Sequence, residues 1–204
     1  MDEIASAKQE LRHAAAARRR SIPSSQLESS GTELENMAAP FIDELPQAAA
    51  IAAYISMGTE IQTLPLLRHI LRSDRRVLVP RLGSGMEIGW SEIADVEELD
   101  QLTDMPRRAS GGLRPQEPTD TVTLPPDALA EAACILVPAF AIDNRGIRLG
   151  RGAGWYDQAL IHRDPQSTLL GICWPWEQRE EPLPAHDHDV PVHGILTTDS
   201  FGLL

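Results

Sequence analysis

The 204-residue chain contains no long hydrophobic run. None of its apolar segments approaches the roughly 18 consecutive residues that a membrane-spanning helix needs. The opening residues, MDEIASAKQELRHAAAARRR, also lack the apolar core of a secretory signal. We therefore expect a cytoplasmic protein with no membrane partner.

Cysteine and positive charge are both scarce. The two cysteines, Cys134 and Cys173, lie in apolar runs, which predicts buried free thiols rather than a disulfide. Lys and Arg total 18 against 30 Asp and Glu, so the net charge is −12. An acidic surface repels phosphate backbones, which argues against a nucleic-acid partner. Local clusters of arginine on this background indicate a specific small anion.

Internal repeats and low-complexity segments are absent as well, and apolar segments alternate in the order expected of an α/β protein. This alternation predicts one three-layer domain over residues 1–204, with a mostly parallel sheet and helices on both faces. Strands are predicted at residues 48–57, 75–80, 86–93, 133–140, 168–174 and 194–199. Helices are predicted at residues 4–20, 26–45, 64–73 and about 154–162, with Thr63 as the cap of the third. Residues 103–127 are predicted to be a long irregular stretch.

Ligands of such sheets bind beyond the carboxyl ends of the strands, and an unusual segment follows one of these ends. Residues 143–157 read DNRGIRLGRGAGWYD. The segment has no Gly-Lys-Ser/Thr of a Walker A loop and no final glycine of a dinucleotide fingerprint. Its main-chain N–H groups and the forked donors of Arg148 and Arg151 predict a phosphate cradle, at the start of a helix. The alternative is a glycine-rich turn with solvated arginines. The glycines of this pattern are Gly150, Gly152 and Gly154.

The segment closes with two aromatic residues and a carboxylate. Trp155 and Tyr156 either belong to the core or stack on a ligand ring. Asp157 either favours the dipole of the following helix or binds Mg²⁺, which proteins usually hold with one or two carboxylates plus substrate phosphates.

Other polar residues also have two interpretations. Lys8 and Arg12 lie four apart on a predicted helix and either form a solvated face or reach toward an anion. Glu60 follows a predicted strand and is either an exposed loop residue or an acceptor for the N–H donors of a heterocycle.

Residues 186–193, HDHDVPVH, concentrate histidine and aspartate. His186, His188 and His193 suggest a zinc-type site and a metal-dependent hydrolase. Polar, proline-bearing surface loops have the same composition. In a third interpretation, Asp189 shares a Mg²⁺ with Asp157.

Taken in order along the chain, these segments resemble the 5-formyltetrahydrofolate cyclo-ligase family, also called 5,10-methenyltetrahydrofolate synthetases. The resemblance covers nearly the whole chain. It implies an ATP-dependent cyclisation of 5-formyltetrahydrofolate to 5,10-methenyltetrahydrofolate, with Mg²⁺, that releases ADP and phosphate. It rests on KQELR, YISMGTEIQT, VLVPRL, ILVPAFAIDNRGIRLGRGAGWYDQAL and HDVPV.

The resemblance also implies roles for individual residues. Catalytic positions are Arg12, Arg151 and Tyr156. The matching Mg²⁺ ligands are Asp157 and Asp189. The folate substrate is expected at Met57, Glu60, Trp155 and Tyr156, and at Glu117 of the GGLRPQEP element. ATP is expected at Lys8, Arg12, Arg148, Gly150, Arg151, Gly152, Ala153, Gly154, Trp155 and Tyr156.

Three residues depart from the family's pattern. Trp155 stands where many members have tyrosine, Ala153 where a lysine or glycine is common, and His193 where an aspartate is usual. A folate- or nucleotide-binding relative without catalysis is a further alternative, but Asp157, Asp189 and the glycine-arginine segment argue against it. We expect a monomer or a weak homodimer.

Overall fold

The computed structural model describes residues 3–81, 87–105, 114–118 and 122–204. Its framework is a seven-stranded sheet. The strands are β1 (Ala50–Ala52), β2 (Arg76–Pro80), β3 (Trp90–Ile93), β4 (Ala132–Pro138), β7 (Thr168–Ile172), β9 (Gly194–Leu196) and β10 (Phe201–Leu203). Their order across the sheet is β10-β9-β7-β4-β1-β2-β3.

The sheet is mostly parallel, as predicted. Strands β2, β1, β4, β7 and β9 pair in parallel, and the two edge strands β3 and β10 are antiparallel to their neighbours. The chain passes from β1 to β2 on one side and then returns to place β4 on the other side of β1. Such a reversal of strand order opens a crevice beyond the carboxyl ends of the two diverging strands.

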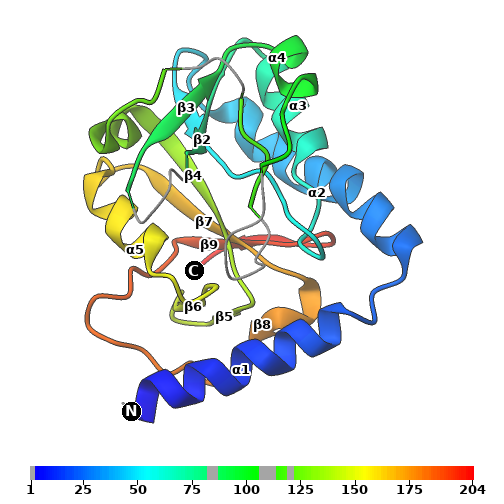
Figure 1. Ribbon diagram of the computed structural model, residues 1–204, viewed down its shortest axis with the longest axis vertical. Helices are drawn as coiled ribbons and strands as arrows, with labels where there is room; N and C mark the ends of the chain where they lie inside the picture. Colours follow the sequence, from blue (N-terminus) through cyan, green and yellow to red (C-terminus); the bar gives the residue numbers. More distant parts are fainter. Residues whose placement is uncertain (1–2, 82–86, 106–113, 119–121) are drawn as a thin grey trace.

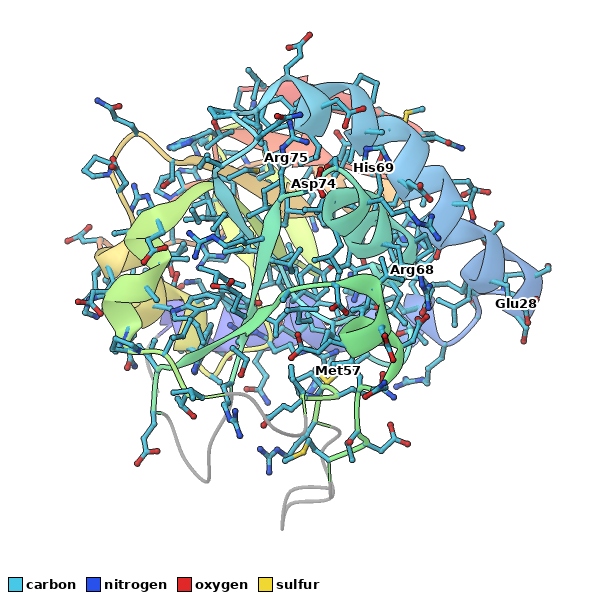
Figure 2. All side chains as sticks on the ribbon, turned by 90° about the horizontal axis from the view of Figure 1, so that it is seen from above. Glu28, Met57, Arg68, His69, Asp74 and Arg75 are labelled. Carbon is cyan, nitrogen blue, oxygen red and sulfur yellow. The ribbon has the colours of Figure 1, made fainter. Side chains whose placement is uncertain are left out.

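One face of the sheet is covered by α2 (Ser24–Glu44), α3 (Leu64–Arg72) and the short α4 (Val96–Asp100). In α3 the apolar positions recur at helical spacing and are buried, whereas Arg68 and His69 point outward (Figure 2). A contact of 2.9 Å between His69 Nε2 and Asp43 Oδ1 links α3 to the end of α2. The buried side chains of α3 are Leu66, Leu67, Ile70 and Leu71.

The opposite face is covered by η1 (Pro126–Glu131), α5 (Trp155–Ala159) and η2 (Leu160–His162). Leu129 and Leu160 from this layer are fully buried against strand residues such as Ile135. The two layers and the sheet between them form the predicted three-layer α/β arrangement (Figure 1).

Helix α1 (Glu3–Arg19) lies apart from both layers, across a small second sheet (Figure 1). That sheet has the order β6-β5-β8, with β5 (Ala141–Asp143), β6 (Arg148–Leu149) and β8 (Gln178–Arg179). The buried Arg19 of α1 donates 2.7 Å bonds to both carboxylate oxygens of Glu177, in η3 (Pro175–Glu177). Breaking such a buried pair leaves an uncompensated charge, so this pair fixes the carboxyl end of α1.

Several predicted elements differ from the observed ones. Strand 48–57 is reduced to β1, and strand 86–93 begins at Trp90, residue 86 lying outside the described part. Thr63 precedes α3 but does not cap it with its side chain, because its hydroxyl bonds Tyr54 O at 2.7 Å and Ser56 N at 3.0 Å. Of residues 103–127, residues 106–113 and 119–121 lie outside the described residues.

The glycine-arginine segment also differs from its prediction. Its first part is a β-hairpin made by β5 and β6 rather than a loop. Helix α5 has only 5 residues and continues as the 3-10 turn η2. Among the described residues no helix is both long and apolar enough to cross a membrane.

Candidate active site

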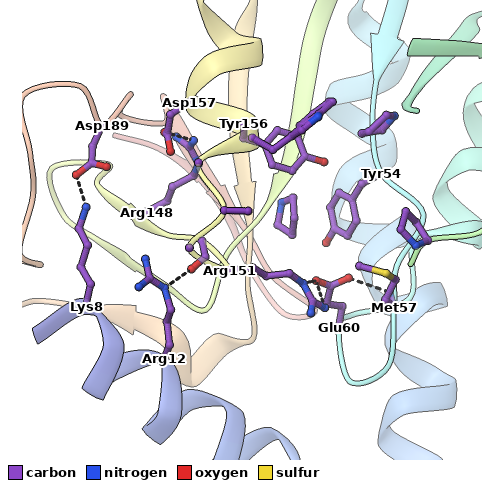
Figure 3. A pocket seen from close by; sticks show the side chains of 18 of the residues that line it. Lys8, Arg12, Tyr54, Met57, Glu60, Arg148, Arg151, Tyr156, Asp157 and Asp189 are labelled. Atoms are coloured by element: carbon purple, nitrogen blue, oxygen red, sulfur yellow. Dashed lines mark hydrogen bonds and ion pairs between the residues drawn. The ribbon is translucent and has the colours of Figure 1, made fainter. Parts of the chain in front are cut away.

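A cavity of about 610 Å³ lies at the carboxyl ends of β1 and β4, where the strand order reverses. Its wall combines the segment after β1, the glycine-arginine segment, α1 and residues 186–189 (Figure 3). Segments far apart in sequence therefore meet around one space. Polar residues on the wall are Lys8, Arg12, Tyr54, Glu60, Gln116, Arg148, Arg151, Tyr156, Asp157, His186, His188 and Asp189.

Asp143 fixes the base of the glycine-arginine segment. Its carboxylate is fully buried and accepts bonds from the N–H groups of Arg145, Ile147 and Leu183, at 2.8 to 3.0 Å. The Arg145 guanidinium adds two more, at 2.7 and 3.0 Å. Burial alone would raise the pKa of this carboxyl, but the hydrogen bonds outweigh it and hold the pKa below its usual value. Gly146 closes the turn at φ 78°, a left-handed conformation that favours glycine.

The second part of the glycine-arginine segment, residues 150–154, forms a turn whose main-chain N–H groups are largely unpaired within the described part of the chain. Gly152 and Gly154 have φ values of 97° and 69°, so the backbone turns sharply before α5. Among the described residues, no hydrogen-bond acceptor meets the main-chain N–H groups of residues 151–154. Arg12 lies over this turn: its Nε donates to Gly150 O at 2.8 Å, and a Cβ at Gly152 would lie 3.1 Å from its Cζ.

Two ion pairs hold the cationic side of the cavity. Lys8 Nζ lies 2.5 Å from Asp189 Oδ2, which also accepts the His186 N–H at 2.7 Å. Arg148 donates to Asp157 Oδ1 and to Val190 O, both at 2.5 Å. Burial would raise the pKa of Asp189, but the bonds from Lys8 and His186 hold it below its usual value.

Glu60 lies on the opposite side of the cavity, and its carboxylate is buried, not solvated. It is 3% exposed. Its Oε2 accepts the Met57 N–H at 2.8 Å, and its Oε1 accepts Arg151 Nε and Nη2 at 3.1 and 2.8 Å. The exposed-loop interpretation of Glu60 is therefore wrong.

Two aromatic residues on the wall carry neutral hydroxyls. Burial raises the pKa of Tyr54 and of Tyr156 well above the usual value, and the nearby Glu60 carboxylate raises both further. Neither phenol is suited to act as a base. Tyr54 and its neighbour Ile55 were not predicted as site residues; their place directly after a buried strand was the available signal.

Trp155 belongs mainly to the core, although it borders the cavity. It is 7% exposed and packs edge-on against Trp90, with ring centroids 5.4 Å apart. Its indole N–H donates to Glu87 O at 3.2 Å. Tyr156, whose ring lies 5.0 Å from that of Trp155, is the partly exposed member of the pair.

Two predicted site residues do not lie on the cavity wall. Glu117 is not among the lining residues, although Pro115 and Gln116 are; its carboxylate pairs with Arg114 at 3.1 Å. His193 lies near the start of β7, where its Nδ1 accepts the Leu169 N–H at 3.1 Å. The other predicted site residues all line the cavity.

The position of His193 separates the three histidines of the zinc hypothesis. His186 and His188 stack with centroids 5.1 Å apart and, with Asp189, form a group whose ligand atoms lie within 4.8 Å. The Lys8 ammonium already contacts this group, 3.4 Å from His186 Nδ1. The two cysteines are buried and free, as predicted.

Comparison with known proteins gives consistent matches along nearly the whole chain. A model of the 5-formyltetrahydrofolate cyclo-ligase family matches residues 4–198. The 5-formyltetrahydrofolate cyclo-ligase of Mycolicibacterium smegmatis is 31% identical over 196 residues, which cover 93% of each chain. That of Haemophilus influenzae is 30% identical over 154 residues, covering 75% of this chain and 78% of the relative.

Solved structures share the fold. Aquifex aeolicus 5,10-methenyltetrahydrofolate synthetase aligns with a TM-score of 0.72 at 22% identity, covering 96% of this chain and 92% of that one. The Mycoplasma pneumoniae 5,10-methenyltetrahydrofolate synthetase gives 0.69 at 19% identity, with 95% and 99% covered. The fold, the cavity and these matches together define an α/β enzyme of the ligase class. The chain belongs to the 5-formyltetrahydrofolate cyclo-ligase family.

Proposed function

We propose that the protein converts 5-formyltetrahydrofolate to 5,10-methenyltetrahydrofolate at the expense of ATP, with Mg²⁺, and releases ADP and phosphate. The observation that carries this proposal is the single cavity at the strand-order reversal. It gathers cations, open main-chain N–H groups, two carboxylates and a buried glutamate from four separate segments. Phosphoryl transfer depends on this kind of positioning and charge neutralisation more than on a protein nucleophile.

The triphosphate of ATP would bind on the cationic side. Exposed N–H groups at residues 151–154, in a backbone that alternates through positive φ, form the concave kind of surface that binds anions. Arg12 and Lys8 reach the same space from α1, and Arg148 and Arg151 reach it from the segment itself. This arrangement replaces the expected helix N-terminus, because α5 is too short to contribute a strong dipole.

Asp157 and Asp189 have a donor set that fits Mg²⁺. In each, one oxygen bonds a cationic side chain, and the other has no protein partner among the described residues. Mg²⁺ typically takes one or two carboxylate oxygens and completes its shell with water and phosphate. Bound there, the ion would neutralise charge on the phosphates of ATP.

The pterin would bind on the side of Glu60. This carboxylate lies beside Met57, Tyr54 and Tyr156, which provide an apolar and aromatic surface for a flat ring. A buried carboxylate is a strong acceptor for ring N–H donors. Its position beyond β1, across the cavity from the phosphate side, would direct the formyl group toward the γ-phosphate.

The reaction then needs two bond exchanges. The formyl oxygen attacks the γ-phosphorus and ADP leaves, which converts a poor leaving group into phosphate. N10 attacks the activated formyl carbon, loses its proton, and the C–O bond breaks to release phosphate. Arg12, Arg151 and the loop N–H groups would stabilise charge on the transferring phosphoryl group.

The test is to incubate the purified protein with 5-formyltetrahydrofolate, ATP and Mg²⁺ and to follow the methenyl chromophore. We expect product only when both ATP and Mg²⁺ are present, with one ADP formed per product. Product formed equally well without ATP, or no product at all, would defeat the proposal. Metal analysis of the purified protein is a second, independent test. Stoichiometric, tightly held zinc would favour the alternative of a metal-dependent hydrolase.

A further inference from the structure

Glu60, the carboxylate proposed to hold the pterin, already forms an ion pair with Arg151. Both hydrogen bonds from the Arg151 guanidinium end on Glu60 Oε1 (Figure 3). Arg151 is also one of the cations proposed to contact ATP. One side chain therefore lies between the two proposed substrate sites, and this inference rests on the proposed function.

The two partners of this ion pair differ in how firmly they are held. The Glu60 side chain is 4% exposed, and its second oxygen is fixed by the Met57 N–H. The preceding Thr59 is anchored by a 3.0 Å bond from the Trp174 indole N–H to its carbonyl. The Arg151 side chain is 46% exposed and is followed by Gly152 at positive φ. Arg151 is thus the partner that can move.

Glu60 needs a partner at all times, because an unpaired buried carboxylate is costly. In the structure that partner is Arg151; in a folate complex it would be the N–H donors of the pterin. A pterin that enters alone must displace Arg151 from Oε1. A nucleotide that draws Arg151 onto its phosphates removes this competitor beforehand.

We propose that Arg151 couples the two substrates by exchanging between Glu60 and the phosphates of ATP. Nucleotide binding frees Glu60, so that folate binds more tightly after ATP. By linkage, folate must raise the affinity for nucleotide by the same factor. We expect a factor of about ten, within the range of about 5- to 150-fold that is typical of coupled sites.

The surface pair Arg68–Asp100 offers a matched control. Arg68 on α3 donates through Nε and Nη2 to the single oxygen Asp100 Oδ1, at 3.2 and 2.6 Å, as Arg151 does to Glu60. The Asp100 side chain is 52% exposed, and Arg68 is not on the cavity wall. Removing Arg68 therefore deletes the same bond geometry without touching the site.

The experiment measures the dissociation constant of 5-formyltetrahydrofolate by calorimetry, with and without a non-hydrolysable ATP analogue and Mg²⁺. In the wild-type protein the analogue should tighten folate binding about tenfold. In Arg151→Met, folate alone should bind about as tightly as it binds wild type with the analogue, and the analogue should then change its affinity less than about twofold. Arg151→Gln should behave like Arg151→Met, and Arg68→Met like wild type.

Three results would overturn the inference: an analogue that leaves wild-type folate affinity unchanged, coupling that persists in both Arg151 variants, or weaker folate binding by those variants in the absence of nucleotide. The chromophore assay separates this failure from a failure of the proposed function. Methenyl product with uncoupled binding would overturn only the role of Arg151, whereas absent folate binding and absent product would overturn both.

Discussion

The two halves of the glycine-arginine segment use the same residue types for opposite purposes. In residues 141–149 the polar groups are satisfied internally, since Asp143 collects five hydrogen bonds and the Arg148 guanidinium is bound to Val190 O and Asp157. In residues 150–154 the backbone turns through glycines at positive φ and lines the cavity, and the N–H groups of residues 151–154 have no acceptor among the described residues.

This contrast separates stability from function within one short stretch of sequence. The hairpin half holds its hydrogen bonds in a buried environment, where an unmatched group costs about 1–3 kcal/mol. The open half has few internal bonds to lose but presents donors to a ligand. Substitutions in the first half should therefore change the free energy of unfolding, and substitutions in the second half should change substrate kinetics.

The largest effect on turnover is expected for Asp157→Asn, in α5 just after the open half. Loss of a negative oxygen that fits Mg²⁺, and of the Arg148 partner, should lower kcat/KM by about 100-fold. Excess Mg²⁺ should recover part of this loss. Asp187→Asn, at an exposed position of the neighbouring segment, is the control and should remain active. Full activity of Asp157→Asn would remove this residue from the metal site.

Asp143→Asn tests the hairpin half. The amide that replaces one carboxylate oxygen would face donors of Arg145 and Leu183, so we expect a loss of about 3 kcal/mol in the free energy of unfolding near pH 7. The lowered pKa of Asp143 sets the pH dependence. The wild-type advantage is complete above the unfolded pKa of about 3.9 and shrinks as pH falls through the lower folded pKa.

Chemical denaturation at several pH values measures this difference for Asp143→Asn. Asp100→Asn is the control, because its pair with Arg68 is exposed and such pairs contribute about 0–1 kcal/mol. An advantage that grew toward acid pH would contradict the assigned hydrogen bonds. The kcat of Asp143→Asn, measured well below its melting temperature, should stay close to that of wild type.

A smaller effect is expected for Gly152→Ala. A Cβ there would press on the Arg12 guanidinium and would also have to adopt φ near 97°. We expect the KM for ATP to rise about tenfold, equivalent to about 1.4 kcal/mol. Gly154→Ala carries the conformational cost alone, because among the described residues, its chain neighbours aside, no atom lies within 4 Å of its Cβ position. An equal effect of both substitutions would show that displacement of Arg12 is unimportant.

Much of the framework was predictable from the sequence because it depends on local patterns. Helix α3 follows from apolar residues at helical spacing, and strand β4 from a continuous apolar run. The site residues came from resemblance and not from pattern alone. Which of these residues pair with one another could not be predicted from the sequence, because the pairs are far apart along the chain. Lys8 and Asp189 are separated by 181 positions, and Glu60 and Arg151 by 91.

One difference between the predicted and the observed elements has a specific physical cause. The hairpin in the glycine-arginine segment was missed because β5 and β6 are only three and two residues long, too short for a periodic signal. Glu117 was expected at the folate site from its motif, and this stays a prediction. Its neighbours Pro115 and Gln116 line the cavity, whereas its own carboxylate pairs with Arg114.

The Arg19–Glu177 pair has a consequence for how the protein is made. Its partners are separated by 158 positions, so the first helix emerges from the ribosome well before the glutamate that anchors it. At about 5–20 residues per second, that interval is roughly 8–30 seconds. During this time Arg19 lacks its carboxylate partner, and nascent chains that stop before η3 cannot form the buried ion pair that fixes the carboxyl end of α1.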